Sequence, residues 1–418
     1  MRLEGFKSMP TRPFATAVVR RLTQAGHIAY FAGGWVRDFL MKTPSDDIDI
    51  ATSARVEEVQ ALFPRTVPVG IAFGIVIVIE EGHPFEVATF RQDQGYVDGR
   101  RPTGIAPATP KEDALRRDFT INGMFYDPLQ ERLYDYVGGQ NDIQEKKIRA
   151  IGNPHERFLE DRLRMMRAVR YATRFGFSIE QATEHAIIEH APSLLPAVAM
   201  ERIWQEFKKM SKFAHFDEGL IALHRLGLLP VIFPRLKGQA LEVVQQQLLP
   251  LKDYPTDTPA IAELLELFPN DSLEELVQLC EYLKLSNQEK ELVTHFHHIR
   301  SMLSMPEDWQ RSLEPIEWAQ FYARPHANLF LRLFEARLTP DKKIEFRTEH
   351  ALRQEKLLPW ITRIQQKNPV VRAEDLILAG ILPGPVLGKC LKEAERISVN
   401  LNLEDKAAII SMLQKSSS

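Results

Sequence analysis

The spacing of hydrophobic and polar residues changes near residue 150. Before it, short apolar or alternating runs predict β-strands in "IAYFAGG", "DIDIAT", "GIVIVIEE" and "PFEVATF", with Gly, Pro and Asp turns between them. After it, apolar residues recur at helical spacing, as in "DSLEELVQLCEYLKL", "PIEWAQFYARPHANLFLRLFEARL" and "RTEHALRQEKLLPWITRI". We therefore predict an α+β N-terminal part, with helices around a mixed β-sheet, followed by an all-α remainder.

Composition sets broad limits on this picture. A chain of 418 residues is too long for one simple core and predicts several domains. Cys280 and Cys390 lie far apart and indicate neither a zinc cluster nor a disulfide framework. The N-terminus has no apolar signal core and no run approaches membrane-spanning length, so we expect a cytoplasmic protein without a membrane partner. A net charge of −3 argues against coating nucleic acid all over, but allows a local basic stripe.

Two acids alternate with isoleucines in the predicted strand of "PSDDIDIATSA". In an extended chain, Asp47 and Asp49 point to one side, while Ile48 and Ile50 pack on the other. An exposed acidic strand face is the simpler interpretation of this stretch alone. The alternative is a site for Mg²⁺, which binds a few carboxylates together with water and substrate phosphates.

Neighbouring segments favour the metal interpretation. In "FAGGWVRDFL", Gly33 and Gly34 stand between a strand and a helix that carries Arg37, where the backbone can approach a phosphate closely. A Gly-Gly pair by itself is more often only a turn. A third acid, Glu86, lies in the strand "PFEVATF". A glycine turn, an alternating acid pair and a third carboxylate are the parts of a two-metal site for phosphoryl transfer.

The segment "LRRDFTINGMFYDP" adds Arg116, Arg117 and Asp118. Arginine suits phosphate because its guanidinium binds in a bidentate manner, and an adjacent acid can accept a hydrogen bond from a ribose hydroxyl. A surface ion pair is the alternative for this segment on its own.

The most informative helix is predicted in "HERFLEDRLRMMRAVRYATRFGF". One apolar stripe is expected to be buried, while Asp161, Arg164, Arg167 and Arg170 recur on a polar face. This face is either a solvated, salt-bridged surface or a nucleotide site. In the second case the acid and the arginine three residues later face a base edge, and the further arginines meet phosphates.

In order along the chain, "GGWVRD", "DDIDI", "RRDFTIN", "YDYVGGQNDI" and "EDRLR" resemble the motifs of the class II tRNA nucleotidyltransferase and bacterial poly(A) polymerase family. The resemblance covers residues 28–210, and "ILPGPVLGKCLKEAE" resembles the family's helical tail more loosely. It implies a nucleotidyltransferase head at residues 1–150, a neck with base-recognition helices at 151–215, and a tRNA-binding body and tail at 216–418. It also implies Mg²⁺ in a two-metal site and binding of the tRNA acceptor and TΨC arm.

The resemblance also implies a role for individual residues. Asp47 and Asp49 would hold the metals, with Glu86 as the third catalytic carboxylate. Asp161 and Arg164 are similar to the pair that reads the Watson–Crick edge of the incoming base. The full set of nucleotide-binding residues would be Gly33, Gly34, Arg37, Arg117, Asp118, Asn122, Asp161, Arg164, Arg167 and Arg170.

Three activities of this family use the same active site. The stretch "RQDQGYVDGRRP" resembles the flexible loop that helps the enzyme switch from CTP to ATP, which argues against an enzyme that adds only CC. The segment "FPRTVPVGIAFGIVIVI" lacks the basic run expected of the poly(A) branch. We therefore expect addition of CCA from CTP and ATP with release of pyrophosphate, ahead of A-addition to tRNA ending in CC and of poly(A) synthesis. The sequence departs from the family in "AMERIWQEF", where Met200 replaces the usual serine.

Other interpretations are weaker. A nucleotidyltransferase that modifies antibiotics or proteins would not need "EDRLR" and a long helical arm, and a non-catalytic RNA-binding scaffold would lack the carboxylates. The histidines of "THFHHIR", at positions 295, 297 and 298, predict a partly exposed helix face rather than a metal site. Oligomeric state is left open. The expected tRNA contacts in the helical part are Lys342, Lys343, Arg347, Arg353, Lys356 and Arg363.

Overall fold

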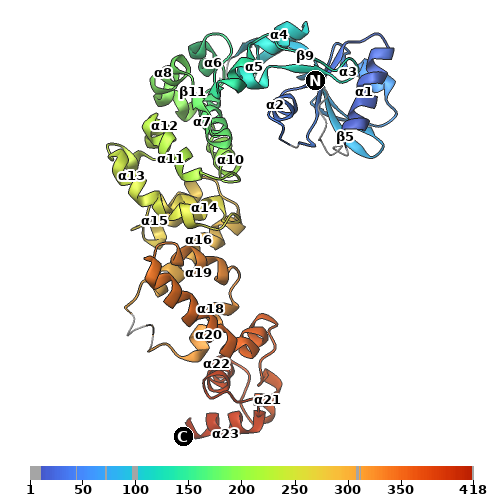
Figure 1. Cartoon of the computed structure of the whole chain (residues 1–418). Helices are drawn as coiled ribbons and strands as arrows, with labels where there is room; N and C mark the ends of the chain where they lie inside the picture. Colours follow the sequence, from blue (N-terminus) through green and yellow to red (C-terminus); the bar gives the residue numbers. More distant parts are fainter. Residues whose placement is uncertain are drawn as a thin grey trace. The chain divides into compact units, whose positions relative to one another are not determined.

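The chain folds into two compact units, Met1–Gln246 and Gln247–Ser418. Figure 1 shows the elements of each unit. The borders expected at residues 150 and 215 both fall inside the first unit. The computed structural model describes residues 11–416 except 44, 71–72, 97–101, 307–309 and 311.

A mixed sheet forms the centre of the first unit. Its strands are β1 (Ala29–Ala32), β2 (Asp49–Thr52), β3 (Thr66–Gly70), β4 (Ile75–Glu80), β5 (His83–Thr89), β8 (Phe125–Asp127) and β9 (Arg132–Tyr134). The strand order is β3-β4-β5-β2-β1-β8-β9. Only β2 and β5 pair in parallel; the other neighbours are antiparallel. The strands predicted from the apolar runs are therefore confirmed, and they share one sheet.

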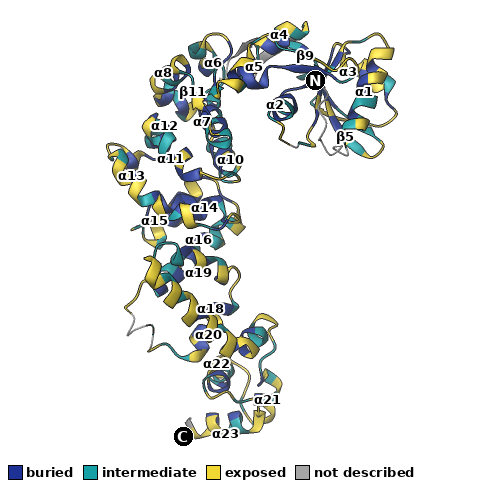
Figure 2. Cartoon of the chain, viewed as in Figure 1, coloured by how far each residue is buried: buried dark blue, intermediate teal, exposed yellow. Residues whose placement is uncertain are grey.

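Short helices and a separate hairpin complete this part of the chain. They are α1 (Arg12–Gln24), α2 (Gly34–Leu40), α3 (Val56–Leu62), α4 (Pro110–Leu115), the 3₁₀ turn η2 (Thr120–Asn122), α5 (Gly139–Gln144), and the hairpin strands β6 (Arg91–Tyr96) and β7 (Pro102–Pro107). The apolar face of α1, with Val18 and Leu22, is buried in the same core as Val76 and Val78 of β4. Figure 2 shows this burial along the strands.

Helices follow the sheet in the first unit, with one short parallel pair of strands. The elements are β10 (Lys147–Ile148), α6 (Pro154–Glu160), α7 (Leu163–Phe175), β11 (Ser178–Ile179), α8 (Gln181–His190), η3 (Ala191–Ser193), α9 (Leu194–Ala197), α10 (Met200–Met210), α11 (Phe216–Arg225), α12 (Leu228–Ile232) and η4 (Pro234–Leu236).

The helix predicted through "HERFLEDRLRMMRAVRYATRFGF" is two helices, which corrects the sequence interpretation. Helix α6 ends at Glu160, and Asp161 has extended backbone angles of φ −146° and ψ 104°. Its carboxylate accepts the backbone N–H of Leu163, the first residue of α7, at 3.1 Å. A short acidic side chain that bonds a nearby backbone donor competes with helix continuation, which explains the break.

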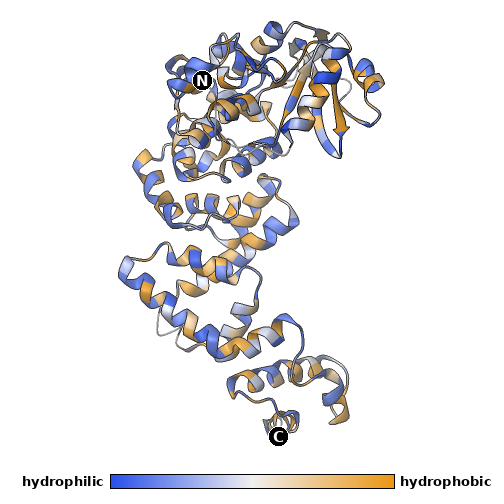
Figure 3. Ribbon diagram, turned by 45° about the vertical axis from the view of Figure 1, so that its right-hand side comes forward, coloured by the Kyte–Doolittle hydropathy of each residue, from blue (hydrophilic) through white to orange (hydrophobic). Residues whose placement is uncertain are grey.

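The second unit is helical, as the apolar periodicity predicts. Helix α13 (Leu241–Leu248) crosses the border between the units. The later helical elements are η5 (Leu249–Asp253), α14 (Ala260–Leu264), η6 (Leu265–Leu267), α15 (Leu273–Tyr282), α16 (Asn287–Leu303), α18 (Pro315–Ala323), α19 (Ala327–Glu335), α20 (Pro340–Gln365), α21 (Ala373–Leu378), α22 (Pro385–Asn400) and α23 (Lys406–Ser416). Hydrophobic and hydrophilic residues alternate along these helices in Figure 3. Among the described helices, none combines the length and apolar character that crossing a membrane would require.

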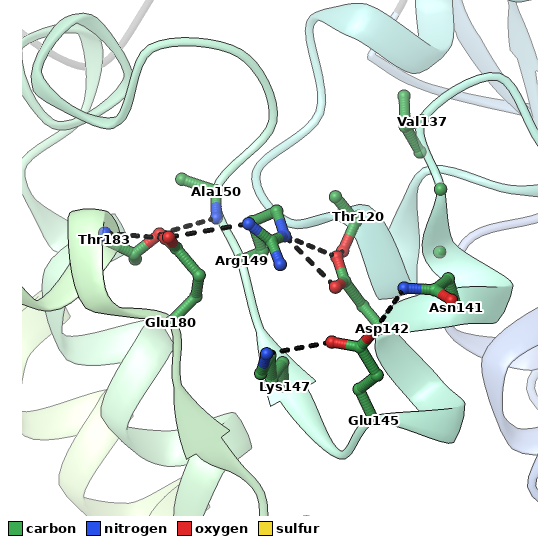
Figure 4. A network of polar contacts seen from close by, with 12 residues as sticks. Thr120, Val137, Asn141, Asp142, Glu145, Lys147, Arg149, Ala150, Glu180 and Thr183 are labelled. Carbon is green, nitrogen blue, oxygen red and sulfur yellow. Dashed lines mark hydrogen bonds and ion pairs between the residues drawn. The ribbon is translucent and has the colours of Figure 1, made fainter.

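A polar network supports the turn that follows the two arginines of "LRRDFTIN". The buried Asp142 of α5 accepts the hydroxyl of Thr120 at 2.6 Å and the Nε of Arg149 at 3.1 Å. Arg149 also pairs with Glu180 at 3.5 Å, immediately before α8. Figure 4 shows Arg149 between these two carboxylates. The network thus joins the 120–122 turn to α5 and to the start of α8.

Gly139 allows α5 to approach this turn closely. A Cβ at Gly139 would lie 2.4 Å from the carbonyl oxygen of Thr120 and 2.8 Å from the sulfur of Met124. Because such overpacking forces a backbone shift, we expect Gly139→Ala to lower the free energy of unfolding by about 1–3 kcal/mol. Urea denaturation measures this. The control is Gly388→Ala, whose Cβ would meet nothing within 4 Å and should leave the midpoint unchanged or slightly higher. An unchanged midpoint for Gly139→Ala would contradict the close approach.

Candidate active site

The register of the sheet brings two acids side by side. In the parallel pair of β2 and β5, Ile50 stands opposite Val87. The preceding residues, Asp49 and Glu86, therefore enter the sheet next to each other. On the other side of β2, Asp49 pairs with Ala32, the last residue of β1. The acids thus lie at the point where β1 turns into the glycine segment.

Asp47 joins this group through the alternation predicted from the sequence. Asp47 and Asp49 are exposed, while Ile48 and Ile50 are buried. The carboxylate of Asp49 is nevertheless partly desolvated by the protein around it. This desolvation, together with the charges of Glu86 and Asp47, raises the pKa of Asp49 to about 6. The donor atoms of the three side chains are all carboxylate oxygens. An oxygen-only set of negative charges suits a hard divalent cation.

Asp49 and Glu86 line a cavity of about 530 Å³ within the first unit. Of the residues predicted to act in catalysis or nucleotide binding, Asp47 alone does not line it, and it acts on the site through its charge on Asp49. The predicted residues that line the cavity are Gly33, Gly34, Arg37, Asp49, Glu86, Arg117, Asp118, Asn122, Asp161, Arg164, Arg167 and Arg170.

The glycine turn is required by its backbone and by its neighbour. Gly33 has φ +66°, a conformation that side chains other than glycine rarely adopt. A Cβ there would also lie 3.2 Å from Nη1 of Arg117. Gly34 is the first residue of α2 and lines the cavity. Because glycine has no side chain, the backbone of these two residues is open to the cavity at this wall.

Four of the predicted nucleotide-binding residues form one hydrogen-bonded row. The buried Arg37 donates to Oδ1 of Asn122 at 2.5 Å, and Nδ2 of Asn122 donates to Oδ1 of Asp118 at 3.2 Å. The guanidinium of Arg167 donates to Oδ2 of Asp118 at 2.6 and 2.9 Å. Although burial opposes ionisation, Arg167 lowers the pKa of Asp118 to about 2. Asp118 therefore stays ionised and oriented at the cavity wall.

Asp161 and Arg164 both line the cavity but do not share a helix face, which corrects the sequence interpretation. Asp161 lies at the break between α6 and α7. Its carboxylate accepts Nη2 of Arg202 at 3.0 and 3.3 Å. Arg164 pairs with Oε2 of Glu160 at 2.6 Å. Each side chain thus has its own partner of opposite charge.

The sequence interpretation missed Asp113. This carboxylate is buried and pairs with Arg116 at 2.8 Å and with Arg117 at 3.0 Å. It also accepts the backbone N–H of Arg91 at 3.2 Å. Both guanidinium groups lower the pKa of Asp113, against the effect of burial. The signal was an acid three and four residues before two arginines, the spacing of ion pairs on a helix.

Two residues of α10 were also missed. Arg202 lines the cavity and holds Asp161, and Glu206 pairs with Arg170 at 2.7 Å, with both side chains buried. Helical spacing puts the two α10 residues on one face, four positions apart. The sequence alone does not indicate which charges of α7 and the preceding turn they meet.

The stretch 97–101 of the expected flexible loop lies outside the described residues.

Comparisons with known proteins identify the family of the chain. Residues 29–149 match the family model of the poly A polymerase head domain, and residues 176–239 match the model described as the probable RNA and SrmB-binding site of polymerase A. The CCA-adding enzyme of Streptococcus mutans is 35% identical over 411 residues, which cover 96% of each chain. That of Bacillus cytotoxicus is 47% identical over 207 residues, 49% of this chain and 52% of the relative.

Solved structures give the same result for the fold. The Bacillus stearothermophilus CCA-adding enzyme in complex with CTP aligns with a TM-score of 0.73 and 28% identity over 98% of each chain. The Thermotoga maritima CCA-adding enzyme complexed with tRNA aligns with a TM-score of 0.69 and 20% identity, over 100% of this chain and 97% of that one. A relative 35% identical over nearly the whole of both chains shows the family, and the chain belongs to the class II tRNA nucleotidyltransferases and bacterial poly(A) polymerases.

Proposed function

We propose that this protein adds the 3′-terminal CCA to tRNA, using CTP and ATP and releasing pyrophosphate. The observation that carries the proposal is that one cavity is lined both by Asp49 and Glu86, suited to nucleotidyl transfer, and by the charged pair suited to base selection. A-addition and poly(A) synthesis would use the same cavity. We favour CCA addition because the relative that covers 96% of the chain is a CCA-adding enzyme.

Membership of this family implies dependence on a divalent metal ion. We propose Mg²⁺ in a two-metal site held by Asp47 and Asp49, with Glu86 beside them. Bound there, the ions would activate the attacking 3′ oxygen of the tRNA and offset the charge on the transferring phosphate. The sheet register is the contribution of the chain itself, because it holds the like-charged carboxylates at fixed positions before any ligand arrives.

The cationic wall of the cavity would bind the triphosphate. Arg37, Arg117 and Arg167 line the cavity, and guanidinium groups suit phosphate oxygens by shape and charge. Two of them already have fixed positions, because Asn122 holds Arg37 and Asp118 holds Arg167. Little reorganisation is then needed when the nucleotide binds. The ionised Asp118 would accept a hydrogen bond from the ribose.

Asp161 and Arg164 would select the base. Cytosine and adenine each present an amino donor beside a ring-nitrogen acceptor, which suits an acidic acceptor and a guanidinium donor. Uracil and guanine would set a carbonyl against the carboxylate and an N–H against the guanidinium. Leaving such buried polar groups unpaired costs on the order of several kcal/mol, enough for strong discrimination. Arg202 and Glu160 would act as positioning residues, because they orient the two reading groups.

The helical part of the chain would hold the tRNA through its backbone phosphates. Four of the six basic residues expected there already form ion pairs, namely Lys343 with Asp253, Arg347 with Glu335, Arg353 with Glu349, and Arg363 with Glu404. A tRNA phosphate would therefore have to displace the acid from each of these basic side chains, or bind to the basic side chain together with the acid. The individual tRNA contacts stay a prediction, as do the roles assigned to residues 1–150, 151–215 and 216–418.

The main test offers the enzyme tRNA transcripts that end before CCA, after C, or after CC, with CTP alone, ATP alone, or both. We expect CTP alone to complete CC on the first two transcripts, ATP alone to extend only the transcript ending in CC, and both nucleotides to complete CCA on all three. Product lengths on a sequencing gel measure this. Extension of the CC transcript only would identify an A-adding enzyme, and a long ladder with ATP alone would identify a poly(A) polymerase.

The metal assignment is tested by Asp49→Asn. We expect incorporation with Mg²⁺ to be abolished, while the melting temperature without metal stays equal or rises slightly, because repulsion from Glu86 and Asp47 is removed. Asp46→Asn is the matched control, since this exposed neighbour bonds Thr11 instead and should retain activity. Substantial incorporation by Asp49→Asn would refute the assignment.

Base selection is tested by Arg202→Gln, which frees the carboxylate of Asp161 without touching its chemistry. We expect the preference for CTP and ATP over UTP and GTP, measured as a ratio of kcat/KM, to fall by roughly tenfold to a hundredfold, the value of one or more charged hydrogen bonds. Lys212→Gln removes an exposed positive charge away from the cavity lining and should leave the ratio unchanged. A lower rate with an unchanged ratio would mean that Arg202 serves the fold and not the selection.

A further inference from the structure

Two histidines and a glutamate gather on α6 and α8, outside the cavity. Nδ1 of His155, near the start of α6, lies 3.1 Å from Nε2 of His190 and 3.6 Å from Oε2 of Glu189. The last two residues end α8, which packs along α6. One side-chain N or O atom of each residue lies within 4.8 Å of those of the other two. Among the described residues this is the group with the spacing of metal ligands, whereas the histidines at 295, 297 and 298 do not form one.

We propose that His155, Glu189 and His190 form a binding site for a transition-metal ion of the Zn²⁺ type, with water as the fourth ligand. Zinc binds imidazole nitrogen at about 2.0–2.1 Å, so neighbouring ligand atoms in a tetrahedral shell stand about 3.3 Å apart. Two of the separations in the structure, 3.1 and 3.6 Å, lie on either side of this value. The third separation, between Glu189 and His190, is within 4.8 Å, so binding would draw these two side chains towards the ion.

The charges and exposure of the group also suit a cation. Two neutral imidazoles and one carboxylate carry a single negative charge, which a divalent ion offsets. The side chains of His155 and Glu189 are 42% and 67% exposed, so an ion can enter directly from solvent. The alternative without a metal is a hydrogen bond between the two imidazoles, with Glu189 as an ion-pair partner of His155 when that histidine is protonated.

This site differs in ligand chemistry from the acids of the cavity. Nitrogen donors favour zinc and its neighbours in the transition series, whereas an all-oxygen set favours magnesium. None of the three residues lines the cavity. The two sites therefore select different ions, and one can be titrated in the presence of the other.

The ion would act as a structural clamp behind the base-selecting residue. It would fix α6 to the end of α8, and α6 leads directly into Asp161. A second connection already runs the same way, because Arg162 donates to the hydroxyl of Ser193 at 3.2 Å and this hydroxyl donates to the carbonyl of His190 at 2.7 Å. The clamp would reinforce this contact, which joins the start of α7 to the end of α8 through η3.

The test titrates Zn²⁺ into chelator-treated full-length protein in excess Mg²⁺, by calorimetry. We expect the wild type to bind one equivalent more than His155→Gln or His190→Gln, and Zn²⁺ to raise the melting temperature of the wild type alone among these three. Glu189→Gln should keep the equivalent with weaker affinity. His185→Gln changes an exposed histidine of the same helix that is not part of the group, and it should bind as the wild type does.

Circular dichroism and Mg²⁺-dependent nucleotide incorporation check that the variants are folded, and Co²⁺ in place of Zn²⁺ should give the visible absorption of a four-coordinate site only where both histidines remain. Equal stoichiometry and affinity in the wild type and both histidine variants would overturn the proposal and leave a hydrogen bond between the imidazoles. Loss of the equivalent in Asp49→Asn, but not in the histidine variants, would overturn it as well, because the zinc would then be bound by the acids of the cavity.

Discussion

Repulsion among Asp47, Asp49 and Glu86 is the constraint on which the rest of the active site depends. Loss of hydration and the two neighbouring charges raise the pKa of Asp49 to about 6, so part of this repulsion is unrelieved near neutral pH. Only a rigid support keeps such groups together. The sheet supplies it, because β2 is paired on both sides and buries Ile50 below the acids. Free energy gained in the core thus offsets the unfavourable charge at the edge of the cavity.

The positively charged side chains of the cavity are also held in place by their surroundings. Each main guanidinium is held by an acid or amide that is itself fixed: Asp113 holds Arg117, Asp118 holds Arg167, and Glu206 holds Arg170. The pair of Glu206 with Arg170 is buried on both sides, and such a pair contributes little net stability because desolvation consumes most of the Coulombic gain. The effect of these pairs is on geometry. An arginine with an oriented partner cannot fold back onto the surface, so it stays directed at the site that an anionic ligand occupies.

The sequence predicted the helices and strands better than the contacts between residues that are far apart in the chain. Alternation of Asp and Ile is a local pattern, and it correctly predicted which side chains of 47–50 are exposed. The pairs Asp118 with Arg167 and Asp161 with Arg202 join residues 49 and 41 positions apart. A pattern in neighbouring residues cannot predict contacts over such separations. The break at Asp161 was missed because the apolar stripe continues across it. A single side-chain hydrogen bond to Leu163 interrupts the helix without disturbing the pattern of burial.

The edge position of β3 bears on how the protein behaves at high concentration. An edge strand presents unpaired backbone groups to which another chain can add, and β3 also exposes Val67 and Val69. Pro68 stands between these valines and has no N–H to donate, and the register shifts between Pro68 and Gly70. Proline and an irregular register are two ways in which natural sheets prevent growth by strand addition. Pro68 and the register shift thus oppose aggregation at the same place where the exposed Val67 and Val69 would favour it.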